Sequence, residues 1–204
     1  MPRGRFTLFH VRGIPIGVDW SWFFVLFLVI WLLSGYYRDL FGEDQEAVGP
    51  YVLAVISAFA FFASILLHEL GHAVVAVRNG IGITEITLWM FGGIAGLKRD
   101  TETPGQEFRI AIAGPAVTFL IAAVCLLAGT AIAGDSFWDV TSFDEGASVS
   151  QAVAVIAWIA NINAVILIFN LLPAFPLDGG RIVRAIAWKL TGDRERGTNF
   201  AARL

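Results

Sequence analysis

The sequence predicts an all-α polytopic membrane protein with about four transmembrane helices, a small membrane-associated β-hairpin and a broken fourth helix. Of its 204 residues, 57% are hydrophobic and only 15% are charged, whereas a soluble domain carries roughly a quarter charged residues. The mean hydropathy of +0.71 agrees with this. Several apolar runs also reach the roughly 20 residues that cross a bilayer. These three observations exclude an ordinary soluble enzyme.

Four apolar segments are long enough to span a membrane, namely residues 20–37, 51–77, 109–133 and 150–172. A less apolar helix is expected over about 179–191. The first segment follows a basic stretch, as a signal peptide would. However, no small-residue cleavage site follows Leu33, so we interpret this segment as a retained membrane helix.

Basic residues are distributed unevenly among the connections between these spans. Thirteen of the fourteen Lys and Arg residues lie in the N-terminal segment, in residues 78–109 or in residues 179–204. The other two connections, 38–50 and 134–149, contain eight acidic residues and only Arg38. The positive-inside rule therefore places the N-terminus and both basic connections in the cytoplasm.

The chain as a whole has a formal net charge of −3, so no nucleic-acid partner is expected.

Residues 81–98 differ from the spans. They contain β-branched residues in partial alternation, then Gly92-Gly93, then a second short apolar run, which predicts a hairpin or looped strand pair. Their apolar character favours contact with the membrane, where protein or water must surround an open backbone edge. An ordinary cytoplasmic hairpin is the alternative.

Three ionisable residues, His68, Glu69 and His72, stand together in the second span. Such residues are costly within a membrane and mark functional sites. Positions i and i+4 share one helix face, so both imidazoles can bind one metal ion. Glu69 projects about 100° around the helix from His68 and can contact a water at the metal. Two histidine ligands and a carboxylate base are typical of a zinc hydrolase. The alternative is a polar cluster that joins helices by hydrogen bonds.

Catalytic zinc usually has three protein ligands. An extended zinc-protease pattern would place a further histidine at position 78, which is Arg78. Asp178 follows Pro173 and Pro176, which break the fourth span, and precedes glycines that permit a tight bend. This break can turn Asp178 toward the histidines, although an aspartate that caps the following helix is the alternative. The other carboxylates considered are expected to be solvated; they are Glu85, Asp100, Glu102 and Glu107.

Three motifs together resemble the bacterial branch of the site-2 protease family: His68-Glu-Leu-Gly-His72, Phe91-Gly-Gly-Ile-Ala95 and Asn170…Pro173…Pro176-Leu-Asp178-Gly. Members of this family are intramembrane zinc metalloproteases that cut transmembrane segments of other proteins. The resemblance implies Zn²⁺ on His68, His72 and Asp178, with Glu69 as the base that activates water. It also implies that Asn170 positions the substrate or stabilises the oxyanion.

The resemblance covers roughly residues 10–195 and implies a single protease core over residues 1–204. Asn163 is interpreted as a helix-packing residue, with a substrate contact as the alternative. Gly114-Pro115 match a helix motif of the family, but Thr118 stands where asparagine is frequent. We expect this departure to affect a packing or substrate contact and to leave the metal site unaffected. Because bacterial members frequently continue into further helices, we expect the chain to be truncated before such helices; a naturally minimal protease is the alternative.

The implied activity is hydrolysis of a peptide bond in or near the transmembrane segment of a membrane-protein substrate. The substrate class includes anti-sigma factors and signal-peptide remnants, and the other partner is the lipid bilayer. The implied location is a bacterial inner membrane, with the active site opening to the cytoplasm. Two other functions stay open: a catalytically silent scaffold that binds membrane helices, and a metal transporter, which gives Glu69 no role. The sequence leaves the oligomeric state undetermined.

Overall fold

The computed structural model describes residues 5–42, 48–90, 92–142 and 149–202. Its elements in chain order are β1 (Arg5–Val11), β2 (Ile14–Asp19), α1 (Trp20–Phe41), α2 (Val48–Arg78), β3 (Ile83–Trp89), β4 (Gly92–Leu97), α3 (Pro104–Ala133), α4 (Asp135–Thr141), α5 (Gln151–Leu171), α6 (Asp178–Thr191) and α7 (Arg194–Ala201). Helices α1, α2, α3 and α5 are long and apolar enough to cross a membrane, which confirms the four predicted spans. Phe91 of the glycine-containing motif lies outside the described residues.

Side-chain caps explain where several helices begin. Helix α1 starts at Trp20, as predicted, because the Asp19 carboxylate accepts the backbone N–H of Ser21 at 3.0 Å. Helix α3 starts at Pro104, five residues earlier than predicted, because the Thr103 hydroxyl caps it. The short helices α4 and α7 were not predicted; in α7 the Asp193 side chain caps the first turn.

The predicted hairpin over 81–98 is confirmed as strands β3 and β4, but it forms only half of a larger sheet. The N-terminal segment, in which no strand was predicted, supplies β1 and β2. The four strands have the order β1-β2-β3-β4, with β2 parallel to β3 and the other pairs antiparallel. Arg12 and Gly13 link β1 to β2 with φ values of 50° and 83°, the left-handed backbone of a two-residue hairpin turn.

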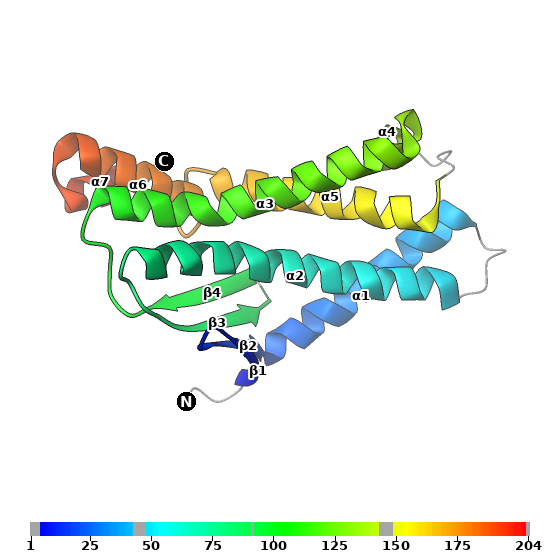
Figure 1. Ribbon diagram of the computed structural model, residues 1–204, viewed down its shortest axis with the longest axis horizontal. Helices are drawn as coiled ribbons and strands as arrows, with labels where there is room; N and C mark the ends of the chain where they lie inside the picture. Colours follow the sequence, from blue (N-terminus) through cyan, green and yellow to red (C-terminus); the bar gives the residue numbers. More distant parts are fainter. Residues whose placement is uncertain (1–4, 43–47, 91, 143–148, 203–204) are drawn as a thin grey trace.

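Helix α2 lies at the centre of the molecule, between the α3–α5 pair on one side and the sheet with α1 on the other (Figure 1). The sheet packs on the C-terminal half of α2 through a core that includes Ile16, Ala73, Ala76 and Ile86. The sheet, α6 and α7 gather at one end, and α4 lies at the opposite end (Figure 1). The connections rich in basic residues therefore meet at the same end of the bundle.

Small and polar residues allow the membrane helices to approach one another closely, as is usual in bilayers. A β-carbon on Gly71 of α2 would lie 2.9 Å from the Ala113 carbonyl oxygen of α3. Asn163 of α5 is fully buried and its amide nitrogen donates to Ser64 Oγ of α2 at 3.1 Å. Its role as a helix-packing residue is thus confirmed.

The expectation that Glu107 is solvated was wrong. Its side chain is fully buried near the start of α3 and forms an ion pair with Arg184 of α6. The Arg184 guanidinium also lies 5.4 Å from the ring centroid of Phe175, in the segment between α5 and α6. Arg184 therefore links the start of α3 to the segment that precedes Asp178. Its ion pair with Glu107 joins residues that are 77 positions apart in the chain.

Candidate metal centre

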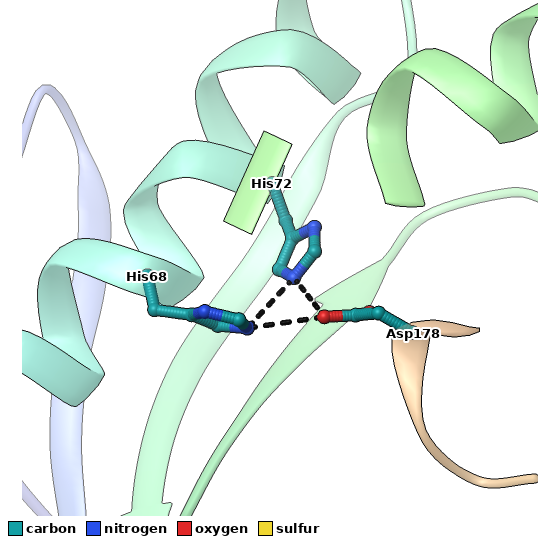
Figure 2. A group of neighbouring side chains, drawn as sticks. All are labelled: His68, His72 and Asp178. Carbon is teal, nitrogen blue, oxygen red and sulfur yellow. Dashed lines mark hydrogen bonds and ion pairs between the residues drawn. The ribbon is translucent and has the colours of Figure 1, made fainter. Parts of the chain in front are cut away.

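The two histidines of α2 and the aspartate at the start of α6 meet inside the protein (Figure 2). The Nε2 atoms of His68 and His72 are 3.1 Å apart. Asp178 Oδ2 lies 3.1 Å from His68 Nε2 and 3.0 Å from His72 Nε2. All three residues are buried. Three ligand atoms thus form a nearly equilateral triangle in the interior of the protein.

Contacts with α3 determine which ring nitrogens point into this triangle. His72 Nδ1 lies 2.7 Å from the Ile110 carbonyl oxygen, which can only accept, so this nitrogen carries the proton. His68 Nδ1 lies 2.9 Å from Thr118 Oγ1, and that hydroxyl donates to the Gly114 carbonyl at 3.3 Å. His68 Nδ1 is therefore also the donor. Each ring then points its Nε2 atom toward the other ligand atoms.

The convergence of these three ligand atoms provides a test of whether a metal ion fits. Two imidazole Nε2 atoms and a carboxylate oxygen converge at 3.0–3.1 Å, an arrangement that a positive charge between them would stabilise. Ligand atoms about 2.0–2.1 Å from a tetrahedral zinc ion are roughly 3.3 Å apart, close to the observed separations. The donor set and its spacing therefore fit a divalent metal such as zinc.

The break between α5 and α6 brings Asp178 to this position. Helix α5 ends at Leu171, and α6 starts at Asp178 itself, with Leu177 as the capping residue and no side-chain cap. Asp178 does not cap the helix, which was the alternative role. Gly179 allows the chain to fold back, because a β-carbon there would lie 2.2 Å from the Leu172 carbonyl oxygen. The predicted broken helix is confirmed.

A cavity of about 420 Å³ opens beside the triangle of ligand atoms. Its lining includes His68, Glu69 and Asn170, together with Gly92 and Gly93 at the start of β4. Glu69 packs directly on Gly93, where a β-carbon would lie 2.3 Å from its Cγ. The predicted general base thus faces the cavity, next to the ligand triangle and not within it.

Asn170 lies on the same cavity but does not belong to the triangle. Its Nδ2 donates to the Ile166 carbonyl of its own helix at 2.9 Å. An amide group has two N–H bonds, so a second donor is available to a molecule in the cavity. The structure thus brings together the ligand residues and Glu69, and it places Asn170 on the wall of the cavity beside them.

Thr118 corrects one expectation from the sequence. Position 118 was expected to leave the metal site unaffected, yet its hydroxyl orients His68. The departure from asparagine was visible in the sequence, but its contact with residue 68 was not. The Ile110 carbonyl could not be found from sequence either, because every residue carries one.

The fold and this site define a class of protein, a multi-pass integral membrane protein with a buried metal-binding triad beside a glutamate. The chain belongs to Peptidase family M50, whose model matches residues 56–204. Sequence comparison thereby confirms the resemblance inferred from the motifs.

Two relatives are described as zinc metalloproteases. The protein sll0528 of Synechocystis is 38% identical over 98% of this chain and 50% of its own length. MJ0392 of Methanocaldococcus jannaschii is 36% identical over 97% of this chain and 49% of its own length. The chain thus spans about half the length of these relatives. The solved site-2 protease from M. jannaschii matches 91% of this chain and 72% of its own, with a TM-score of 0.54 and 31% identity.

Proposed function

We propose that this chain is the catalytic core of a zinc-dependent intramembrane endopeptidase that hydrolyses a peptide bond in or near a transmembrane segment. The observation that carries the proposal is the position of Glu69, which borders both the His68–His72–Asp178 triangle and the adjoining cavity. A site that only stored or transported metal would not need a carboxylate there.

The residues divide the chemistry among themselves. His68, His72 and Asp178 would hold zinc, which when bound polarises a carbonyl group and makes a nearby water more acidic. The Glu69 carboxylate takes the proton from the attacking water and passes it to the nitrogen of the departing peptide. Burial of Glu69 against Gly93 fixes the direction of its carboxylate. Asn170 supplies an amide N–H that can hold the substrate or the oxyanion.

The sheet offers a way to present the substrate. A helical peptide bond is shielded by its own hydrogen bonds, so the substrate must unwind before it is cut. Strand β4 forms one edge of the sheet in the described part of the chain, and it begins at the cavity. An unwound segment can add to this edge as a further strand, with its side chains in the largely apolar cavity.

The orientation follows from charge. The basic connections lie at the end that holds the sheet and α6, which supports a cytoplasmic N-terminus and a site that opens to the cytoplasm. His68 stands ten residues before Arg78, roughly 15 Å along the helix from that end. We place the protein in a bacterial inner membrane, with residues 1–204 as one core. Anti-sigma factors and signal-peptide remnants are the substrates we propose.

Glu69→Gln tests the proposal because it removes the base and keeps the size of the side chain. Zinc content per chain and cleavage of a model transmembrane substrate would be measured on the same detergent preparation. We expect zinc to be retained and cleavage to fall at least a hundredfold, the lower range for general-base catalysis. A parent chain that binds zinc and cuts no substrate would instead favour the silent scaffold.

A further inference from the structure

A second pocket, of about 280 Å³, lies at the end of α2 and shares no lining residue with the cavity beside Glu69. Three parts of the chain surround it: the turn between β1 and β2, the C-terminal end of α2, and the strands β3 and β4 with the residues that adjoin them. Neither the proposed catalytic chemistry nor the packing of the helices requires an opening at this position.

Three cations border this pocket, each from a different part of the chain: Arg12, Arg78 and Lys98. Arg12 occupies the left-handed position of the β1–β2 turn. The stem of Lys98 crosses Gly82, where a β-carbon would lie 2.8 Å from its Cδ. No acidic residue belongs to the lining. Within the described residues, none of the three cations is paired with a carboxylate. Their charges are therefore available to an anion.

The opposite wall of the pocket is apolar. Leu70, Val74 and Val77 face it from one side of α2, where residues three and four apart align. Seven residues of helix cover about 10 Å along its axis. Arg78 ends this membrane-spanning helix, so the pocket lies where hydrocarbon gives way to water. Its ligand must combine a negative head with an apolar tail.

We propose that this pocket binds an anionic phospholipid, with the phosphate held by Arg12, Arg78 and Lys98. The first part of an acyl chain would cover Leu70, Val74 and Val77. A free phosphate ion would satisfy the cations but leave the apolar wall uncovered, whereas a lipid satisfies both. Basic pockets at the cytoplasmic ends of membrane helices are suited to such headgroups.

A lipid in this pocket would connect elements that form the catalytic cavity. Arg78 belongs to the helix that carries His68 and Glu69, and Lys98 directly follows β4, whose Gly93 packs on Glu69. The bound lipid would therefore hold the end of β4 against α2. The binding itself is independent of the proposed protease activity and can be measured without a substrate.

Native mass spectrometry of the 204-residue chain in detergent micelles tests this proposal. The chain would be titrated with dioleoyl phosphatidylglycerol and, separately, with dioleoyl phosphatidylcholine. We expect the first molecule of the anionic phosphatidylglycerol to bind more tightly than the first molecule of the zwitterionic phosphatidylcholine. In the double variant Arg78→Gln/Lys98→Gln, affinity for phosphatidylglycerol should fall roughly 25-fold, since each cation near an anionic headgroup contributes about a factor of five.

The matched control is Arg38→Gln/Lys189→Gln, which removes the same charge from two exposed positions outside the pocket. The control should retain the parent's affinity for phosphatidylglycerol. If it loses as much affinity as the pocket variant does, net charge alone explains the effect and the proposal is overturned. Unchanged binding in the pocket variant would also overturn it. Glycerol phosphate and inorganic phosphate provide a third arm. If either displaces the lipid at equal concentration, the apolar wall contributes nothing and the site is one for a free anion.

Discussion

Gly114 of α3 approaches His72 of α2 so closely that a β-carbon on residue 114 would lie 2.2 Å from the Nε2 atom of His72. The same β-carbon would lie 2.7 Å from His68 Nε2. The glycine therefore keeps open the space in which both nitrogens meet Asp178. The helix that forms the wall of the metal centre is as necessary to it as the helix that carries the histidines.

The first prediction concerns this close approach. Gly114→Ala should remove most bound zinc, because the new methyl group would overlap both ligand nitrogens. Metal content per purified chain measures the effect. Gly35→Ala on α1 is the matched control, since a β-carbon there meets nothing within 4 Å. Normal zinc in the Gly114 variant would show that the helices can move apart without losing the site.

The second prediction concerns Thr118, the acceptor of the His68 Nδ1–H. Thr118→Val keeps the shape but removes the hydroxyl, and loss of such a supporting hydrogen bond typically weakens metal affinity about 10–100-fold. Thr118→Ser keeps the hydroxyl and should bind zinc nearly as the parent does. Competition with a chelator measures both affinities. Equal affinities for Val and Ser would remove Thr118 from the site.

The third prediction concerns Asp178, the proposed third ligand of the metal. Asp178→Ala should lose zinc, because two histidines alone leave the site without its third ligand and its negative charge. Asp178→Asn retains the shape but not the charge and should bind zinc more weakly than the parent. Zinc retained at full stoichiometry in Asp178→Ala would mean that another group completes the site.

The fourth prediction concerns the ion pair between Glu107 and Arg184. Arg184→Met leaves a fully buried carboxylate without its partner, which should lower the free energy of unfolding by about 3 kcal/mol. Glu107→Leu combined with Arg184→Met should recover most of that loss, since neither charge remains buried. Thermal unfolding in detergent compares the three chains. A double variant no more stable than Arg184→Met would show that this pair is not the source of the effect.

The fifth prediction concerns pH. The hydrogen bond from the Ser21 backbone N–H lowers the pKa of Asp19 below its ordinary value of 3.8. A carboxyl group with a lowered pKa contributes stability that is present above pH 3.8 and is lost as the pH falls through the folded value. Asp19→Asn still caps α1 but does not titrate. As the pH falls below 3.8, the melting temperature of the parent should therefore drop by more than that of Asp19→Asn. Equal drops in the two chains would contradict the prediction.

Local features of the sequence were sufficient for the spans, the β3–β4 hairpin and the pair of histidines. Helix periodicity and hydrophobic length act over a few residues, so they can be read without the fold. The strands β1 and β2 were missed because only the positive charges of the segment were considered. The alternation of Ile14, Ile16 and Val18 directly after Arg12-Gly13 was a usable signal. The start of α3 was displaced by five residues because the Thr103 cap, and not hydropathy, determines where this helix begins.

The sequence by itself determined that two imidazoles and a glutamate share a membrane helix, because their spacing follows from helix geometry. Only the tertiary structure decided what surrounds them. Asp178 lies 110 positions from His68 and Thr118 lies 50 positions from it, and no local rule relates them. The pairing of Glu107 with Arg184 was likewise invisible, because solvation and burial of a carboxylate look alike in sequence. The packing of α3 and α6 on α2 turns a helical motif into a metal centre, since a third ligand and the orientation of both rings come from other helices.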